Sequence, residues 1–239
     1  MPLVLSRRRP SAERLDDPRL SPEEMRRSLE DLRLVNRRWG ASRALARHLL
    51  GRVDGARSGT RIRIVDVGAG SGDVARGLEA RLRRAGRDAR VAAVDLQWRH
   101  LTAGRAMARD RAFGAPPPAV AADGLRLPFP DGAFDFSVST LFFHHFSPEE
   151  NASILGELCR VARLGFAVLD LRRSLVPLAV VAAAGPFVFR ARVSVEDGVA
   201  SVRQAYTPAE AEAIARRVAP DARAERVFPY RFLLHGGAA

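Results

Sequence analysis

A short glycine-rich segment between a strand and a helix constrains the fold more than any other feature of this sequence. Residues 61–67 turn mostly apolar, which is typical of a strand that enters a buried parallel sheet. Three glycines follow within residues 68–72, and helical periodicity begins at Asp73. Glycine allows a sharp turn and the close approach of a ligand, and a helix N-terminus offers free N–H groups. The segment therefore predicts an α/β fold with a ligand at this turn.

The rest of the chain alternates between strand and helix patterns. A Ser/Thr-Pro-x-Glu signal at Ser21, Ser147 and Thr207 predicts three helix starts. We expect helices at residues 22–39, 41–53, 73–85, 99–110, 148–162 and 208–218. We expect strands at residues 61–67, 90–95, 119–122, 134–141, 165–171, 224–228 and 231–235. This order predicts a doubly wound, mostly parallel seven-stranded sheet with an N-terminal helical cover.

Charge and cysteine content limit the choice of partners. The net charge is +12, and all 39 basic residues are arginine. They are spread along the chain without interleaved aromatic residues, so we expect no nucleic-acid partner. Cys159 is the single cysteine, which excludes a disulfide framework and a cysteine metal cluster.

Membrane and targeting signals are weak. The N-terminus has a very short apolar piece before its arginines, the reverse of a secretory signal. The apolar stretch at residues 175–189 is too short to span a bilayer, but a core helix, a lid or a peripheral membrane contact all remain open. We expect a cytoplasmic enzyme of undetermined oligomeric state.

The glycine turn does not match a dinucleotide site. That fingerprint has the form G-x-G-x-x-G, whereas here the third glycine, Gly72, comes one residue early and Asp73 follows it. An aspartate at that place repels a pyrophosphate. A cationic ligand without phosphates, such as S-adenosylmethionine, suits Asp66 and Asp73. A dinucleotide-dependent oxidoreductase and a non-catalytic S-adenosylmethionine-binding protein remain as alternatives.

The turn resembles the first motif of the class I S-adenosylmethionine-dependent methyltransferases. The match runs through Asp66, Gly68, Gly70 and Gly72, and the similarity extends over about residues 62–171. The resemblance implies the Rossmann-like methyltransferase fold with S-adenosylmethionine as cofactor. It also implies cofactor contacts, with Asp95 on the ribose, Leu96 on the adenine face and Asp123 near the adenine amino group. The remaining implied cofactor residues are Ala69, Gly124 and Leu125.

The acceptor side is less defined. His144 and His145 follow the fourth strand, where the family places the methyl group, and are candidate bases for a phenol or an acidic carbon, or else residues that only hold a loop. No (Asn/Asp)-Pro-Pro-Tyr motif occurs, which argues against amide and adenine nitrogens as acceptors. We expect Trp39, Phe142 and Tyr206 in the acceptor pocket, although helix packing is an alternative for Trp39 and Tyr206. No metal site is expected.

The predicted organisation has two parts. Residues 1–53 form the helical cover and residues 54–239 the methyltransferase domain, with residues 174–206 as an acceptor-binding insertion. Residues 197–203 and 206–208 resemble a bacterial small-molecule branch, near enzymes that act on quinone precursors and aromatic polyketides. We therefore expect methyl transfer to the oxygen or carbon of a small hydrophobic or aromatic acceptor, in secondary metabolism.

Overall fold

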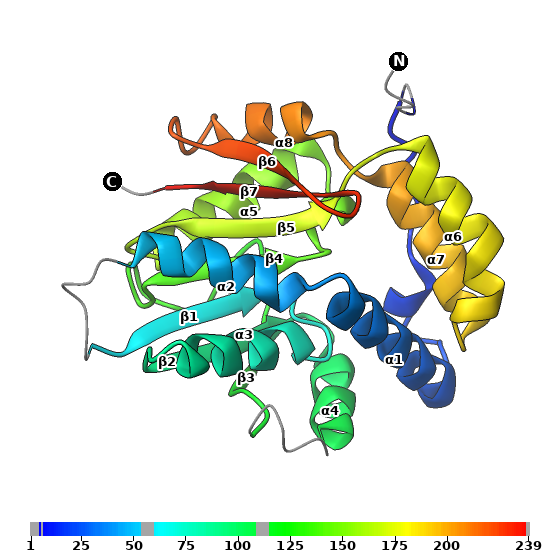
Figure 1. Cartoon of the computed structure of the whole chain (residues 1–239), viewed down its shortest axis with the longest axis horizontal. Coiled ribbons are helices and arrows are strands. Elements are labelled where there is room, and N and C mark those ends of the chain that lie inside the picture. Colours follow the sequence, from blue (N-terminus) through cyan, green and yellow to red (C-terminus); the bar gives the residue numbers. More distant parts are fainter. Residues whose placement is uncertain (1–4, 6, 54–59, 109–114, 238–239) are drawn as a thin grey trace.

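One twisted sheet organises the molecule (Figure 1). The computed structural model describes residues 5, 7–53, 60–108 and 115–237. Within this part, seven strands follow the order β3-β2-β1-β4-β5-β7-β6. Strand β7 runs in the opposite direction to the other six. The strands are β1 (Ile62–Val67), β2 (Ala89–Asp95), β3 (Ala119–Ala121), β4 (Phe136–Thr140), β5 (Phe166–Leu171), β6 (Arg223–Val227) and β7 (Arg231–Gly236). The predicted sheet is confirmed.

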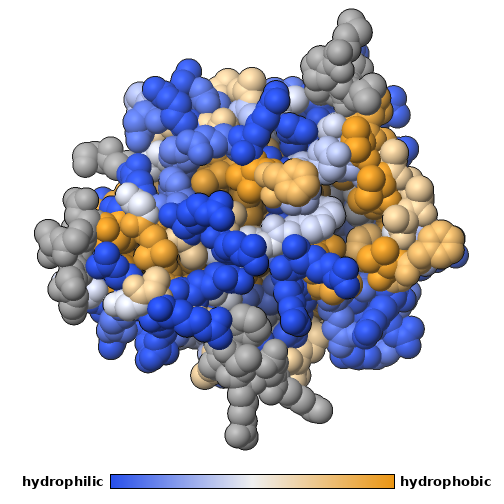
Figure 2. Space-filling model, in the orientation of Figure 1, coloured by the Kyte–Doolittle hydropathy of each residue, from blue (hydrophilic) through white to orange (hydrophobic). Residues whose placement is uncertain are grey.

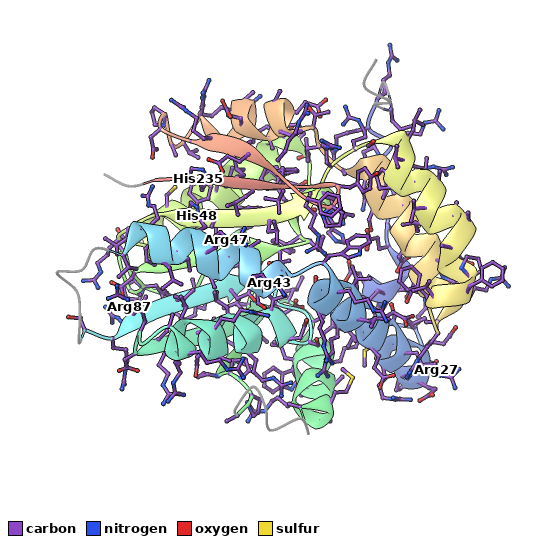
Figure 3. All side chains as sticks on the ribbon, in the orientation of Figure 1. Arg27, Arg43, Arg47, His48, Arg87 and His235 are labelled. Carbon is purple, nitrogen blue, oxygen red and sulfur yellow. The ribbon has the colours of Figure 1, made fainter. Side chains whose placement is uncertain are left out.

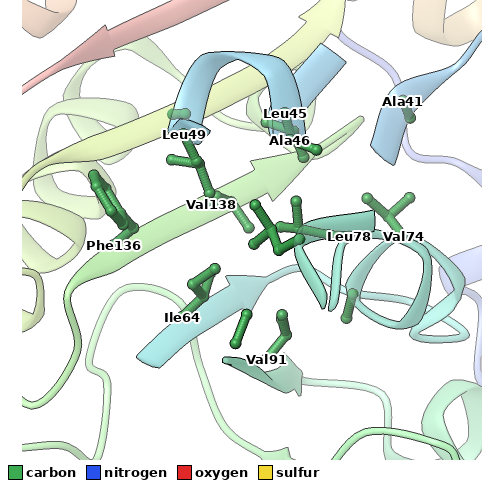
Figure 4. Packing of buried hydrophobic residues seen from close by; sticks show 14 of the residues in the cluster. Ala41, Leu45, Ala46, Leu49, Ile64, Val74, Leu78, Val91, Phe136 and Val138 are labelled. Atoms are coloured by element: carbon green, nitrogen blue, oxygen red, sulfur yellow. The ribbon is translucent and has the colours of Figure 1, made fainter. Parts of the chain in front are cut away.

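Helices cover both faces of this sheet. α2 (Ala41–Arg52) and α3 (Asp73–Arg84) pack on one face, in a cluster that includes Ile64 and Val138 (Figure 4). α5 (Pro148–Val161) and α8 (Pro208–Ala215) pack on the other face, in a cluster that includes Val65. Ile64 and Val65 are neighbours in β1 and point to opposite faces, as successive strand residues do. Both faces are thus apolar and buried, as a parallel sheet requires.

A third group of elements lies at the carboxyl ends of the parallel strands. It contains η1 (Arg14–Asp16), α1 (Pro22–Arg38), α4 (Trp98–Met107), η4 (Phe143–His145), α6 (Leu175–Val188) and α7 (Arg192–Gln204). In Figure 1, α1, α6 and α7 stand beyond the arrowheads of β4 and β5. Helix α7 contacts η1, η4 and α1, so segments far apart in the sequence meet over one edge of the sheet.

The three predicted helix starts are found. Ser21, Ser147 and Thr207 are N-caps whose hydroxyls accept the backbone N–H three residues on, and proline occupies the first turn each time. At Ser147 and Thr207 the glutamate returns the bond to the N-cap N–H, which completes a capping box. These local bonds fix where α1, α5 and α8 begin.

Two helices differ from the prediction. α8 ends at Ala215 instead of reaching Val218, and the chain turns there. Helix α7 was not predicted, because the residues it buries include polar ones, among them Ser194, Asp197 and Ser201. Their polar groups are hydrogen-bonded within the fold, so a pattern of apolar residues does not reveal the buried face. The end of the helix expected at 99–110 lies outside the described residues.

The predicted division at residue 53 stays a prediction. The first part contains two kinds of helix, since α1 lies over the strand ends whereas α2 packs in the same cluster as the sheet. Exposed arginines occur on more than one helix: Arg27 on α1 lies apart from Arg43 and Arg47, which are one turn apart on α2 (Figure 3). Among the described residues, no helix is both long and apolar enough to cross a bilayer.

Candidate active site

A cavity of about 720 Å³ opens at the carboxyl ends of β1, β2 and β4. One side is formed by the glycine turn after β1, by Asp95 at the end of β2, and by residues 140–146 after β4. The other side is formed by residues 11–18, by α1, and by the facing surfaces of α6 and α7. Ligands of open α/β sheets bind at this edge, outside the carboxyl ends of the strands.

The glycine turn at residues 68–72 packs tightly against the ring of Phe142. Gly68 has φ +70°, and a Cβ added there would lie 2.3 Å from the ring of Phe142. The N–H of Ala69 donates to the carbonyl of Val94 at 2.9 Å, which ties the turn to β2. Only glycine fits at this place, because a side chain would meet both a strained backbone and the ring. The turn therefore presents bare backbone to the cavity.

Asp95 is held in one orientation. Its Oδ2 accepts the N–H of Gly70 at 2.7 Å, and its Oδ1 accepts the N–H of Gln97 at 2.8 Å. The side chain is 12% exposed and lines the cavity. Burial raises the pKa of Asp95, and the two N–H donors and His100 oppose that rise. A carboxylate fixed in this way, with acceptor capacity left over, suits a pair of ribose hydroxyls.

Two further carboxyl groups lie behind the turn. Burial raises the pKa of Asp66 well above its usual value, and the charges of Asp73 and Asp95 add to the rise. Neither Oδ atom of Asp66 has a hydrogen-bond partner among the described residues. Burial also raises the pKa of Asp73, which lines the cavity. Three acidic groups so close to the turn fit a positively charged ligand and disfavour a phosphate.

His144 is the centre of a buried ion-pair network. Its Nδ1 lies 2.7 Å from Asp170 Oδ1 and its Nε2 lies 3.3 Å from Glu13 Oε1, while its backbone N–H donates to Asp170 Oδ2. Burial lowers the pKa of His144, but Asp170 and Glu13 outweigh burial and raise it to about 10. The ring is therefore a cation at neutral pH. Both of its nitrogens are donors, so the geometry speaks against His144 as a base.

His145 is in the opposite state. It lines the cavity, and its ring nitrogens lie 3.6 Å from Asp16 Oδ2 and 3.8 Å from Glu13 Oε2, beyond hydrogen-bond distance. Burial lowers the pKa of His145, and the positive charge of His144 lowers it further. The ring is therefore neutral at neutral pH, so one of its two nitrogens carries a free lone pair. A neutral histidine of this kind can accept a proton from a substrate.

Glu13 connects the two histidines. Besides His144, its Oε1 accepts bonds from the Ser201 hydroxyl at 2.5 Å and the Gln204 amide at 2.8 Å. Burial raises the pKa of Glu13, but the two histidines and Ser201 outweigh it and lower the pKa to about 2. Ligand atoms of Glu13, His144 and His145 lie within 4.8 Å of one another, close enough to hold a metal ion. The bonds present make the group an ion-pair network, and the expectation that no metal is used stays a prediction.

Comparison with known proteins agrees with this geometry. Residues 64–165 match the family model of a methyltransferase domain. This part of the chain is thus similar to a methyltransferase domain. A curated relative, the ubiquinone/menaquinone biosynthesis C-methyltransferase of Laribacter hongkongensis, is 33% identical over 115 residues, which cover 48% of this chain and 44% of the relative. The chain thus spans less than half the length of that relative. These similarities agree with the predicted family, enzyme class and cofactor.

Solved structures share the fold over more of the chain. Human N-acetylserotonin methyltransferase, in complex with S-adenosylmethionine, aligns with a TM-score of 0.62 and 13% identity over 92% of this chain and 57% of the enzyme. Magnesium protoporphyrin IX methyltransferase from Synechocystis aligns with a TM-score of 0.55 and 18% identity over 84% of each chain. A methyltransferase from Aquifex aeolicus aligns with a TM-score of 0.51 and 20% identity over 73% of this chain and 81% of that protein.

Most predicted site residues of the methyltransferase domain meet at the cavity. Its lining includes the predicted residues Trp39, Gly68, Ala69, Gly70, Asp95, Leu96, Phe142, His144 and His145. Leu96 is 67% exposed, which leaves its face free for a flat ring. Asp66 lies buried behind the lining, and Gly72 faces a smaller neighbouring pocket.

Besides Asp66 and Gly72, four more predicted residues lie outside the cavity lining. Tyr206 is buried, its hydroxyl donates to the carbonyl of Phe146 at 2.7 Å, and its ring packs on Phe143. Asp123 instead accepts the N–H of Leu125 at 2.9 Å, within its own turn. A Cβ at Gly124 would lie 3.2 Å from Phe142, so this ring stands against both glycine segments. The adenine role of Asp123, Gly124 and Leu125 stays a prediction.

Sequence reasoning missed three charged residues of this site. Asp170 ends β5 in the same way that Asp66 and Asp95 end their strands, so the rule of acidic strand ends contained a signal for it. Glu13 lies ahead of the first predicted helix, where no periodicity marks it. Arg231 begins β7, and it is buried although arginine seldom is.

Proposed function

We propose that this protein transfers the methyl group of S-adenosylmethionine to an oxygen or carbon of a small, hydrophobic or aromatic acceptor. One observation carries the proposal: a single cavity joins the glycine turn and Asp95 to His145 and to the apolar wall of α6 and α7. The first two suit a cationic nucleoside. The wall, with Pro177, Val181 and Phe189, suits an apolar acceptor.

The residues divide the work between binding and proton transfer. Bound S-adenosylmethionine supplies an activated methyl group, and S-adenosylhomocysteine is left after the transfer. The glycine turn, Asp95 and Leu96 hold the nucleoside. Asp73 in the cavity wall, with Asp66 buried behind the lining, attracts its positive end. His145 accepts the proton that the acceptor hydroxyl or acidic carbon loses, so that one proton leaves as one methyl group arrives. The cation at His144 keeps His145 neutral, and the enclosing helices exclude water.

The deciding experiment measures release of S-adenosylhomocysteine with a panel of phenols, quinols and lipids. We expect turnover with an apolar phenol or quinol, and a rate about 10²- to 10⁴-fold lower in His145→Gln with S-adenosylhomocysteine affinity unchanged. His235→Gln is the matched control, because His235 lies on β7 outside the cavity lining. Turnover by His145→Gln within a few-fold of wild type would remove the base. No release with any acceptor would favour the non-catalytic alternative.

The apolar helix α6 favours a peripheral membrane contact as the route of the acceptor. It has no charged residue between Leu175 and Val188, and Phe187 is 90% exposed. Figure 2 shows the apolar patch on the side of the molecule where α6 lies. The exposed arginines Arg190 and Arg192 follow it directly, as expected of a helix that rests on an anionic lipid surface. Because Pro177 and Val181 also line the cavity, the contact leads an apolar acceptor inward.

Vesicle binding tests this contact. Phe187→Asp should lower the affinity for anionic vesicles by about tenfold, since it removes one buried aromatic side chain from the lipid interface. Phe228→Asp is the control, because Phe228 is also 90% exposed but lies after β6. Equal effects of both changes would refute a specific role for α6. Nucleic acid is not proposed as a partner, since the exposed arginines are dispersed (Figure 3), and cytoplasmic location stays a prediction.

A further inference from the structure

Arg231 is a buried cation with open hydrogen-bonding capacity. It begins β7, opposite Leu171 at the end of β5, and its side chain is 1% exposed. Nε and Nη1 have no hydrogen-bond partner among the described residues, and Nη2 lies 3.4 Å from Asn36 Oδ1. Donors left unfilled in the interior are costly, so a guanidinium in this state calls for a ligand or another explanation.

A second buried arginine shows what a structural role looks like in the same fold. Arg173 is 3% exposed, and its guanidinium donates to the carbonyls of Leu5 and Ala205 and to both oxygens of Glu210. Every nitrogen of that side chain has a partner within 2.9 Å. Arg231 lacks such a set. Its nearest carboxylates, Asp170 and Asp73, act on it only through their charge.

The surroundings of Arg231 place it at the glycine-turn end of the cavity. Its guanidinium lies 5.4 Å from the ring centre of Trp39, and Asn36 bridges it to Asp73, with Asn36 Nδ2 3.4 Å from Asp73 Oδ2. Asn36, Trp39 and Asp73 all line the cavity, so the guanidinium lies directly behind this wall.

We propose that Arg231, with Asn36, forms the subsite that binds the α-carboxylate of the methionine part of the cofactor. This inference rests on the proposed function and deepens it. The end of the cavity then carries Asp66 and Asp73 for the ammonium and sulfonium groups and Arg231 for the carboxylate, which matches the charge pattern of an amino-acid zwitterion. A guanidinium donates charge-assisted hydrogen bonds to a carboxylate, and Nε and Nη1 of Arg231 have no partner among the described residues.

Two nucleosides that differ only in the amino-acid part separate this role from a structural one. S-adenosylhomocysteine has the α-carboxylate, and 5′-methylthioadenosine lacks the amino-acid group. Measured by calorimetry, Arg231→Met should lower the affinity for S-adenosylhomocysteine by about 10- to 100-fold. The affinity for 5′-methylthioadenosine should stay within about threefold of the wild-type value. Arg231→Lys keeps the positive charge beside the aspartates and should lose less than Arg231→Met.

The controls distinguish the possible failures. Arg173→Met removes a buried arginine that holds structure, so it should lower the melting temperature while the ratio of the two affinities stays that of wild type. The carboxylate role is overturned if Arg231→Met and Arg231→Lys weaken both nucleosides equally, or weaken neither. If the wild-type protein binds neither nucleoside, the proposed function itself fails and the subsite with it.

Discussion

At the scale of the residue, the clearest consequence concerns the charge on His144. Its pKa is raised from 6.5 to about 10, so its stabilising effect is full below pH 6.5 and is lost as the pH rises through 10. The pKa of Glu13 is lowered from 4.5 to about 2, so its effect is full above pH 4.5 and is lost as the pH falls through 2. The melting temperature of the wild-type protein should therefore decline between pH 6.5 and 10.

His144→Gln tests that decline. The variant should be less stable near pH 6 and should show a flatter curve on the alkaline side, because it lacks the group that loses its proton. Melting temperatures measured across pH 5–10 for wild type, His144→Gln and His235→Gln make the comparison. Parallel curves for the wild-type protein and His144→Gln would contradict the assigned charge.

Gly68 gives a prediction about space. Gly68→Ala places a Cβ 2.3 Å from the Phe142 ring at φ +70°, so we expect at least tenfold weaker S-adenosylhomocysteine binding together with a lower melting temperature. Gly86→Ala is a matched control, since φ is +77° and no atom lies within 4 Å of the added Cβ. That variant should show the backbone strain of about 1–2 kcal/mol alone and bind the nucleoside normally. Equal loss of binding would show that the ring contact is irrelevant.

The sequence predicts some of these residues and not others for a physical reason. Asp66 and Asp95 end adjacent parallel strands, and such ends meet at one edge whatever the rest of the chain does. The opposite states of His144 and His145 depend on Glu13 and Asp170, which come from segments 131 and 26 residues away from His144. No local pattern encodes which of two neighbouring histidines meets two carboxylates.

At the scale of the element, the start of α5 positions the histidine segment. The Ser147 hydroxyl accepts the N–H of Glu150, and Asn151 in the first turn donates to the carbonyls of Phe143 and Phe146. Ser147→Ala should cost about 1 kcal/mol of unfolding free energy, which is roughly 2–4 °C in melting temperature for a chain of this size. Ser153→Ala, within the same helix, should change it by less than about 0.5 kcal/mol. Thermal unfolding of both variants checks this, and a similar loss in each would refute the cap.

Helices with apolar stripes and capping signals can be predicted from the sequence, whereas α7 has neither and was not predicted. The polar residues that α7 buries are satisfied by distant groups: Asp197 accepts the N–H of Arg14 and of Leu15. The partner segment at residues 14–15 is more than 180 residues away in the sequence. Sequence periodicity registers burial only where burial is apolar, so it finds α5 and misses α7.

At the scale of the whole molecule, two halves of the cavity have different origins. The segment that matches the methyltransferase family model, residues 64–165, contributes the glycine turn, Asp95 and the histidines. The other wall comes from residues 11–18, α1 and α6–α7, all outside that segment. The cofactor half is therefore readable from a motif, and the acceptor half depends on long-range packing that no motif describes. For this reason the proposed function names a chemical class of acceptor and not one compound.

Because the cavity joins so many segments, ligand binding should stabilise the entire fold. A ligand at 100 times its Kd adds about 2.7 kcal/mol, which corresponds to roughly 5–10 °C at about 2–4 °C per kcal/mol. S-adenosylhomocysteine should produce a rise of this size in the melting temperature, whereas NAD at the same concentration should produce none. The reason is electrostatic: Asp66, Asp73 and Asp95 lie close together at the glycine turn, where they attract the α-ammonium group of S-adenosylhomocysteine and repel the pyrophosphate of NAD. A larger rise with NAD would mean that the turn binds phosphate despite its three carboxyl groups.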